Sequence, residues 1–379
     1  DCTSAKVEKQ GYDHYRLKEI FEQPRAVAAA MAPHIDLEKN EIRMAGLSAS
    51  LSSQQVEEKL KQVERIFIVA CGTSFYAGMI GEYLLEQLAE IPVEIDVASE
   101  FRYRKPVVPK NSLVIVISQS GETADTLAVL RQVKQAGALA MSLCNVRAST
   151  IDREADFHLY MNAGPEIGVA STKAFTSTLA VMNLFALFMA KLRKRLPRET
   201  EKKHLIEQLA IPAQMESVLA YSKFFAEAAS VLKRYHGFLY LGRGVNYPIA
   251  MEGALKLKEL AYMHAEGYAA GEMKHGPLAL IDEGMAVVVI APQDEVYEKT
   301  ISNLEEAKAR GGKIISIGTA NDTRLEKLSV HMLSLPKSSW MSNPLLTVIP
   351  MQLLAYHVAK ASGKDVDQPR NLAKSVTVE

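Results

Sequence analysis

Short apolar runs rich in β-branched residues recur along the chain, and each is followed by a loop and a segment whose apolar positions have helical spacing. The clearest runs are Ile66–Ala70, Leu113–Ile117, Phe238–Leu241 and Val287–Ala291. Uninterrupted apolar strands that alternate with helices are typical of parallel sheets covered by helices on both faces. The pattern therefore predicts an α/β fold.

The strand–helix pattern occurs twice, at an offset of roughly 170 residues, which indicates a duplicated domain rather than a solenoid. We expect five strands in each copy, in a doubly wound order. Each copy closes with a strongly apolar helical segment. The corresponding segments are Arg65–Gly72 and His236–Gly242, Ser112–Ser120 and Met285–Gln293, His158–Met161 and His331–Ser334, and the closing helices Thr172–Lys191 and Pro344–Lys360.

Segments outside the repeat suggest the domain boundaries. Tyr15–Met31 has helical spacing, and Gln23-Pro24 should kink or split that helix. Arg193–Ala213 is rich in charge, contains two prolines and is the predicted linker between the copies. We thus expect an N-terminal linker and helical segment (1–44), a first domain (45–200), a second domain (201–365) and a C-terminal tail (366–379).

Composition then excludes several classes of protein. Lysine plus arginine equal aspartate plus glutamate at 44 each, so no net charge recruits nucleic acid or an anionic membrane. Cys2, Cys71 and Cys144 are too widely spaced for a disulfide framework or a cysteine zinc site. Leu179–Ala190, the longest apolar run, is too short to span a bilayer, and no signal peptide is recognisable. We expect a soluble cytoplasmic protein.

Two hydroxyl-rich loops follow neighbouring predicted strands of the first copy: Cys71–Ser74 and Ser118-Gln119-Ser120-Gly121-Glu122-Thr123. Ligands of such sheets bind beyond the carboxyl ends of the strands, and a helix N-terminus attracts anions. Simple N-capping is the alternative, but two such loops in one copy favour a phosphate held by neutral donors. Ala291–Glu295 of the second copy is acidic and should not bind phosphate. No nucleotide-binding glycine motif stands in a suitable place.

A charged face lies on the predicted helix Tyr247–Leu260, which has Pro248 in its first turn. Glu252, Lys256 and Glu259 recur at i, i+4 and i+7, hence on one side. The face is either a ladder of surface ion pairs or a half-buried site in which Lys256 tunes Glu259 as a proton carrier. The apolar remainder of the helix favours the second interpretation.

Two further segments contain side chains that could bind a metal or take part in catalysis. His264–Pro277 contains two histidines and two glutamates, but its spacing matches no helical metal motif, and its glycines predict a loop, so we expect no metal. His275 in that loop suits proton transfer near neutral pH. Lys374 follows a proline-stiffened, nearly uncharged approach in the tail Asp367–Glu379. This lysine is either a solvated surface residue or one held inside a site.

The Ser118–Thr123 loop and the tail resemble those of the glucosamine-6-phosphate synthase family, the glutamine:fructose-6-phosphate aminotransferases. The duplication resembles the sugar isomerase (SIS) double domain, and the resemblance covers essentially the whole chain. It implies two tandem SIS domains, each with three αβα layers around a flavodoxin-like, doubly wound parallel sheet, and an ordered C-terminal tail. The resemblance implies that these residues bind the sugar phosphate: Ser74, Ser118, Gln119, Ser120, Thr123, Val169, Ser171, Lys256 and Ala373.

Catalytic roles are implied by the same resemblance. Lys374 would form a Schiff base with the C2 ketone, Glu259 would move a proton between C1 and C2, and His275 would help open the ring from across a homodimer interface. The implied reaction converts fructose 6-phosphate and ammonia to glucosamine 6-phosphate, or interconverts fructose 6-phosphate and glucose 6-phosphate when ammonia is absent. Neither metal nor organic cofactor is implied.

The family makes ammonia in an upstream glutaminase domain that uses an N-terminal cysteine. Cys2 here follows Asp1, so we expect Cys2 to be a linker residue and the chain to lack glutaminase activity. Two other classes stay open. A related SIS isomerase or deglycase would keep the phosphate loops and Glu259 but would not predict this tail. A non-catalytic sugar-phosphate sensor could dispense with Glu259, His275 and Lys374.

Overall fold

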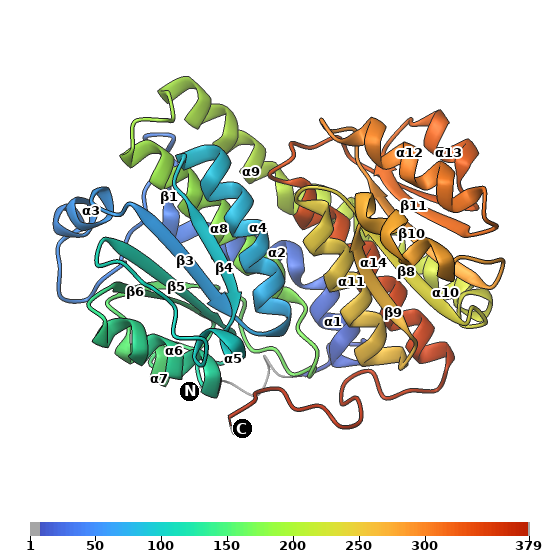
Figure 1. The fold of residues 1–379 in the computed structure, drawn as a ribbon, viewed down its shortest axis with the longest axis horizontal. Coiled ribbons are helices and arrows are strands. Elements are labelled where there is room, and N and C mark those ends of the chain that lie inside the picture. The colour runs from blue at the N-terminus through green and yellow to red at the C-terminus, as the bar shows by residue number, and fades with distance from the viewer. Residues whose placement is uncertain (1–7, 378–379) are drawn as a thin grey trace. The chain divides into compact units, whose positions relative to one another are not determined.

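The computed structural model describes residues 8–377, which fold into two compact units. The first-sheet unit comprises residues 25–166, 173–209 and 373–377; the second-sheet unit comprises 8–24, 167–172 and 210–372. Figure 1 shows the elements of each unit along the blue-to-red course of the chain. Cys2 lies outside the described residues. The division of the chain at residues 44, 200 and 365 stays a prediction.

Each unit is built on a five-stranded sheet, parallel throughout. The orders are β4-β3-β5-β6-β7 and β9-β8-β10-β11-β12, so both sheets have the same doubly wound topology. This confirms the predicted fold class and the duplication. The strands are β3 (Arg65–Ala70), β4 (Val93–Val97), β5 (Ser112–Ser118), β6 (Leu139–Cys144), β7 (Phe157–Tyr160), β8 (Gly237–Gly242), β9 (Ala265–Ala269), β10 (Met285–Ala291), β11 (Lys313–Thr319) and β12 (His331–Leu335).

Helices cover both faces of each sheet because the central strands are apolar on both sides. In the first-sheet unit, Val114 and Val116 of β5 pack with α6, while Ile68 and Ile117 lie against α4. The helices of this unit are α3 (Ser53–Lys61), α4 (Gly72–Ala89), α5 (Ala98–Phe101), α6 (Ala124–Gln135), α7 (Thr150–Glu154) and α8 (Lys173–Leu192). Those of the second-sheet unit are α1 (Tyr15–Phe21), α10 (Ser222–Leu232), α11 (Asn246–Ala261), α12 (Tyr297–Lys308), α13 (Thr323–Leu328) and α14 (Asn343–Ala361).

Two predicted helices can be compared with the structure in detail. The first is split at Glu22 into α1 and α2 (Gln23–Met31), as Gln23-Pro24 predicted. The longest apolar run belongs to α8, which is longer than the run itself and by length and composition alone could cross a membrane. However, 89% of that apolar window is buried inside the protein, which is typical of a core helix.

The predicted linker is mostly helical. Helix α9 (Arg198–Leu219) covers much of Arg193–Ala213 and has Pro212 inside it. Glu201 anchors its start, because this buried carboxylate accepts a hydrogen bond from Ile42 N (2.9 Å) and pairs with Lys191 (3.1 Å). Tertiary contacts therefore order a segment whose prolines and charges suggested irregular structure.

The prediction that His264–Pro277 forms a loop was also wrong in part. Its first half is strand β9, and the 3₁₀ helices η3 (Ala270–His275) and η4 (Pro277–Leu280) follow. A Cβ atom at Gly267 would lie 2.5 Å from Met251 Cα. Glycine is therefore present in this strand because the backbone of α11 packs directly against it, not because the chain turns there.

Candidate active site

The two hydroxyl-rich loops of the first-sheet unit begin at one switch point. Strands β3 and β5 are neighbours, with Ala70 paired to Ile117, and β4 lies on the other side of β3. The connections after β3 and β5 therefore diverge, and ligands of such sheets bind at the carboxyl ends of strands that meet in this way. Ser74 is half-buried in the first turn of α4, and Thr123 immediately precedes α6.

Hydrogen bonds brace the Ser118–Thr123 loop internally. Ser118 Oγ accepts from Gly121 N (3.0 Å) and lies 2.9 Å from Thr123 Oγ1, while Ser120 Oγ accepts from Glu122 N (3.2 Å). Thr123 stands at the N-cap of α6 but makes no side-chain capping bond, so capping does not account for it. Of the Ser118 and Thr123 hydroxyls, one donates its proton to the other. The hydroxyl that accepts, and that of Ser120, can each still donate an O–H to a ligand.

The backbone of this loop is fixed from the next strand connection. Asn145 N donates to Gln119 O (3.1 Å), and Thr150 N donates to Glu122 Oε1 (2.8 Å), which holds the pKa of the Glu122 carboxyl below its ordinary value. Gly121 has φ +69°, and a Cβ there would collide with the Ser149 side chain. Only glycine fits this close approach.

Not every backbone donor of the loop is available to an anion. Gly121 N and Glu122 N donate to serine hydroxyls of the same loop, and Ala124 N donates to Val376 O of the tail (3.1 Å). The prediction that backbone N–H groups at this helix start hold the phosphate is thus restricted. We therefore expect the hydroxyls of Ser118, Ser120 and Thr123 to contribute more of the phosphate contacts.

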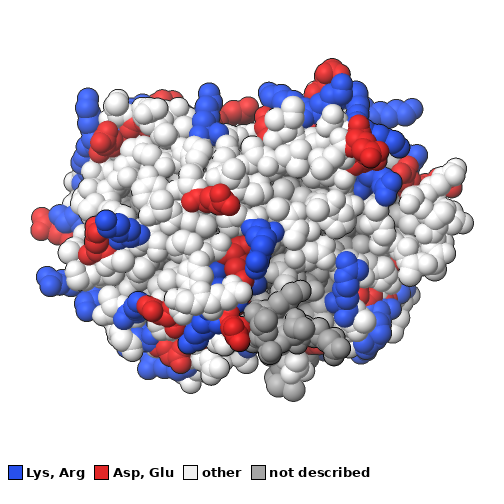
Figure 2. Space-filling model, turned by 180° about the vertical axis from the view of Figure 1, so that it is seen from behind, with Lys and Arg blue, Asp and Glu red and all other residues white. Residues whose placement is uncertain are grey.

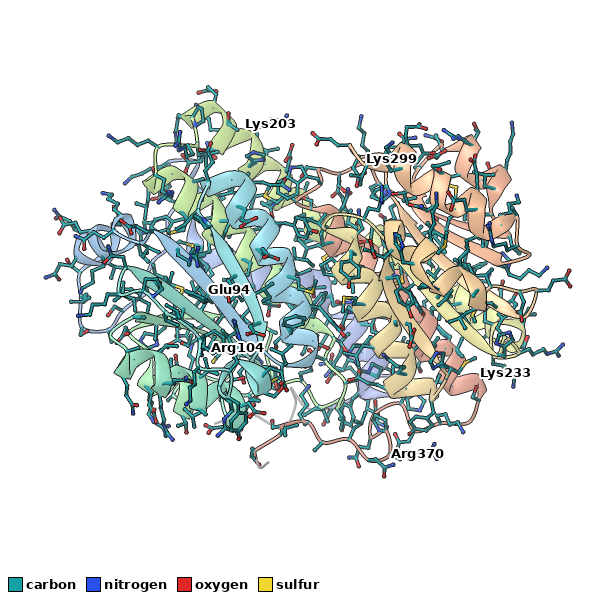
Figure 3. The ribbon with its side chains drawn as sticks, in the orientation of Figure 1. Glu94, Arg104, Lys203, Lys233, Lys299 and Arg370 are labelled. Carbon is teal, nitrogen blue, oxygen red and sulfur yellow. The ribbon has the colours of Figure 1, made fainter. Side chains whose placement is uncertain are left out.

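The C-terminal tail is held at several points along its described length. In the second-sheet unit, the Asp367 carboxylate accepts from Tyr15 N (3.1 Å) and Arg16 N (2.8 Å) at the start of α1. Arg370 N donates to the Tyr262 hydroxyl (2.7 Å), and the Arg370 guanidinium lies 4.4 Å from the Tyr262 ring centre (Figure 3 labels Arg370). Such anchors confirm an ordered tail.

Lys374 lies within the first-sheet unit. Its Nζ is 2.5 Å from Glu166 Oε2, and its side chain is 25% exposed, whereas that of Glu166 is fully buried. Two residues further on, Val376 O bonds to Ala124 N, directly after Thr123. The structure thus brings Lys374 to the unit that carries the Ser118–Thr123 loop, and its side chain is not fully solvated. That it lies inside a site stays a prediction. The neighbouring Ala373 is exposed.

The predicted charged face of α11 is buried in the second-sheet unit. Lys256 Nζ lies 3.4 Å from Glu252 Oε1 and 2.5 Å from Glu259 Oε2, and the three side chains are 1%, 0% and 20% exposed. Burial opposes the charge of Lys256, but the two carboxylates outweigh it, so the pKa of Lys256 lies above its ordinary value; Arg16 acts against this rise. The surface-ladder alternative is wrong, and Glu259 is the member that solvent reaches.

Helix α1 holds the segment that contains Val169 and Ser171. Glu19 Oε1 accepts from Ile167 N (2.5 Å) and Gly168 N (3.1 Å). Arg16 donates to Ser171 O (3.4 Å) and to the Thr172 hydroxyl. This segment belongs to the second-sheet unit, and the serine loops belong to the first. That all of them line one pocket stays a prediction.

His275 ends η3 and is exposed, followed by Gly276 at φ +138°. Its donation across a dimer interface stays a prediction. Glu266, one of the metal-type residues nearby, bonds instead to the Tyr268 hydroxyl. Across residues 8–377, no three or more histidine, cysteine, aspartate or glutamate side chains gather as a metal would require.

Four charged residues at these sites escaped the sequence analysis: Glu166, Arg16, Glu19 and Asp367. Each acts on a partner remote in the chain, and Lys374 is 208 positions from Glu166. The sequence contained a weak signal for Glu166. It is the only charged residue in the stretch 161–172, which connects β7 to the buried start of α8.

Comparison with known proteins then places the chain. The SIS domain family matches residues 59–188 and 233–361. The chain belongs to the SIS domain family. This SIS double domain is 43% identical to the C-terminal domain of glucosamine-fructose-6-phosphate aminotransferase from Francisella tularensis, with a TM-score of 0.90, and the match covers 96% of this chain and 99% of that one.

Two curated relatives extend the likeness of this SIS double domain. It is 51% identical over its full length to glutamine–fructose-6-phosphate aminotransferase [isomerizing] of Chlorobaculum tepidum, covering 61% of that protein. It is 50% identical over 98% of its length to the protein of the same name from Bacteroides thetaiotaomicron, of which it covers 60%. The resemblance noted from the motifs is confirmed, and the chain spans about 60% of the length of these curated relatives.

Proposed function

We propose that this SIS double domain is the isomerase part of a glutamine–fructose-6-phosphate aminotransferase. It would convert fructose 6-phosphate and ammonia to glucosamine 6-phosphate, and interconvert fructose 6-phosphate and glucose 6-phosphate when ammonia is absent. One observation carries the proposal: the tail holds Lys374, whose side chain is partly exposed, against Glu166 and bonds through Val376 to the residue that follows the Ser118–Thr123 loop. A nucleophilic amine beside a donor-rich loop suits a phosphorylated ketose.

Each predicted residue has a role in the proposed reaction. Ser74, Ser118, Ser120 and Thr123 would hold the phosphate through their hydroxyl groups. Lys374 would capture the C2 ketone as an imine, which positions the sugar. Further members of the site would be Gln119, Val169, Ser171 and Ala373 as sugar contacts, Lys256 as a donor to sugar oxygens, Glu259 as the carrier of the proton between C1 and C2, and His275 as the group that opens the ring.

The charge cluster on α11 supports catalysis over simple sensing. Glu252 and Lys256 are buried, and burying charged groups is costly unless they are paired. A sensor that only recognises a phosphate has no need of such a cluster ending in a solvent-accessible carboxylate, Glu259. A deglycase would use Glu259 but has no use for a tail lysine held at Glu166.

The proposal extends to partners and location. We expect a homodimer in which His275 completes the partner's site, a glutaminase domain upstream in the full-length protein, and residence in the cytoplasm. Figure 2 shows lysine and arginine side chains interspersed with aspartate and glutamate on the face in view, which suits a protein that binds neither nucleic acid nor a membrane surface. Neither a metal nor an organic cofactor is needed for this chemistry.

Purified polypeptide should form glucose 6-phosphate from fructose 6-phosphate in a coupled assay, and glucosamine 6-phosphate when ammonium is added. Glu259→Gln keeps the shape but removes the base, so turnover should fall by about 10²-fold or more while sugar-phosphate affinity stays within a few-fold. Glu266→Gln, a half-buried glutamate of the same unit, is the control. Absence of isomerisation by the unaltered polypeptide, or full turnover in Glu259→Gln, would reject this function.

A further inference from the structure

Glu166 is a buried carboxylate in direct contact with the reacting amine of the proposed mechanism. Its side chain is fully buried, its Oε2 lies 2.5 Å from Lys374 Nζ, and its Oε1 accepts a hydrogen bond from Ala174 N (3.1 Å) in the first turn of α8. The Lys374 side chain is 25% exposed. The lysine side chain is therefore partly open to solvent, whereas the carboxylate that it contacts is not.

Two features stabilise the negative charge of Glu166 at this depth. An ammonium group pairs with it, and the N-terminal end of the 20-residue helix α8 provides a backbone donor and the positive end of a helix dipole. Oε1 accepts from Ala174 N, and Oε2 contacts Lys374 Nζ. This geometry suits a base that exchanges a proton with that amine.

Resting on the proposed function, we propose that Glu166 is a catalytic residue of imine formation, which takes a proton from the Lys374 ammonium and later returns it to the departing oxygen. Transfer of the proton from Nζ to Oε2 leaves a neutral amine and a carboxylic acid. The nitrogen lone pair then attacks C2, the N–C bond forms, and the C=O π pair moves to oxygen. Proton transfer from nitrogen to that oxygen gives a neutral carbinolamine.

Dehydration completes the cycle of Glu166. The carboxylic acid donates its proton to the carbinolamine hydroxyl, the C–O bond breaks, and water leaves while the nitrogen lone pair forms the C=N bond. The products are one water molecule, a protonated imine and a Glu166 carboxylate, so atoms and charges balance. The regenerated carboxylate is then paired with the iminium cation as it was with the ammonium.

Borohydride trapping of the polypeptide with fructose 6-phosphate, followed by peptide mapping, tests this role. The variant is Glu166→Gln, which keeps an oxygen for Ala174 N. Glu201→Gln is the matched control: Glu201 is 2% exposed, pairs with Lys191 at 3.1 Å and accepts from Ile42 N, and Lys191 lies at the opposite end of α8. Glu166→Asp, which keeps the charge on a shorter side chain, provides a second variant.

We expect the trapping rate of Glu166→Gln at neutral pH to fall by about 10²-fold, the scale of general acid–base catalysis, while Glu201→Gln matches the unaltered chain. The deficit should shrink as pH rises, because hydroxide and water then deprotonate the ammonium. A purely structural role would lower the rate equally at every pH. Glu166→Asp should retain more activity than Glu166→Gln.

The outcomes separate the inference from the proposed function. An adduct at Lys374 that forms equally fast in the unaltered chain and in Glu166→Gln overturns the role of Glu166 but leaves the function intact. A deficit that does not change with pH, or that Glu201→Gln and Glu166→Asp share in full, also overturns it. If the unaltered chain gives no adduct at Lys374, the imine step of the proposed function and this inference fail together.

Discussion

Lys256 and Lys374 are each paired with a carboxylate at 2.5 Å, but the two side chains differ in their burial and in their other neighbours. Lys256 is buried between two carboxylates, and its raised pKa keeps it an ammonium donor through neutral pH. Lys374 is partly exposed, with Glu166 behind it. A nucleophile must reach its substrate, whereas a donor can act from within the protein. Exposure and neighbours thus suit the two lysines to different roles in the proposed reaction.

The role of the Ser118–Thr123 loop can be tested by comparison with the equivalent loop of the second copy. Ser120→Ala and Thr123→Ala should each weaken sugar-phosphate binding by about 1–3 kcal/mol, because a hydrogen bond to a charged group is lost. Gln293 and Asp294, at the equivalent position of the second copy, are the control sites. Asp294 there accepts from Asn246 Nδ2 (3.1 Å) and Val296 N (3.0 Å), and burial raises its pKa. Calorimetric titration with glucose 6-phosphate measures the difference, and equal losses in both copies would indicate two phosphate sites.

Among the elements, α1 has an effect out of proportion to its length. Its N-terminal N–H groups bind Asp367 of the tail, and Glu19 holds the backbone of Ile167 and Gly168. Val169 N in turn donates to Asp367 O (3.0 Å). One short helix therefore fixes both the segment that contains Val169 and Ser171 and the start of the tail that carries Lys374.

Removing the Glu19 carboxylate should release this segment. Glu19→Ala removes the carboxylate that accepts from Ile167 N and from the buried Gly168 N, so we expect faster amide hydrogen exchange at both residues and a loss of about 1–3 kcal/mol of stability. Glu22→Ala, at the C-cap of the same helix, is the control because Glu22 pairs with Lys18 at a longer distance, 3.7 Å. Unchanged exchange at residues 167–168 in Glu19→Ala would show that other contacts hold the segment.

At the scale of the whole molecule, each unit contains a buried histidine that resists protonation. Burial lowers the pKa of His34 in the first-sheet unit and of His357 in the second-sheet unit to about 4. In the unfolded chain both would titrate near the ordinary value of about 6.5. Between these values the unfolded state binds more protons than the folded state, so stability falls as pH drops.

Acid should therefore destabilise the protein from about pH 6.5 down to about pH 4, by up to about 3 kcal/mol for each histidine. Neither ring nitrogen of His34 has a hydrogen-bond partner among the described residues, so His34→Phe should remove its share of the pH dependence. His236→Phe, at a side chain that is 55% exposed, is the control. Urea unfolding at pH 7.5 and pH 5 measures the effect, and an identical pH slope in His34→Phe would contradict it.

The sequence by itself determined most of the elements and their repetition, because strand and helix patterns depend on the local spacing of apolar residues. It also located the Ser118–Thr123 loop, the α11 face and the tail, whose residue types are informative in a short window. The inclusion of Gly267 in β9 was not predictable in this way, since its cause is the backbone of α11 packed against it.

Only the tertiary structure decided which of those charges are buried and with what partner. The spacing of Glu252, Lys256 and Glu259 is the same on a surface helix as on a buried one, and local pattern does not distinguish them. The contact of Lys374 with Glu166 joins residues 208 positions apart, and the charge on Glu166 depends on the start of α8 and on the tail that reaches it. Burial and long-range pairing are properties of the folded chain, and here they give ordinary lysines and glutamates their distinct chemistry.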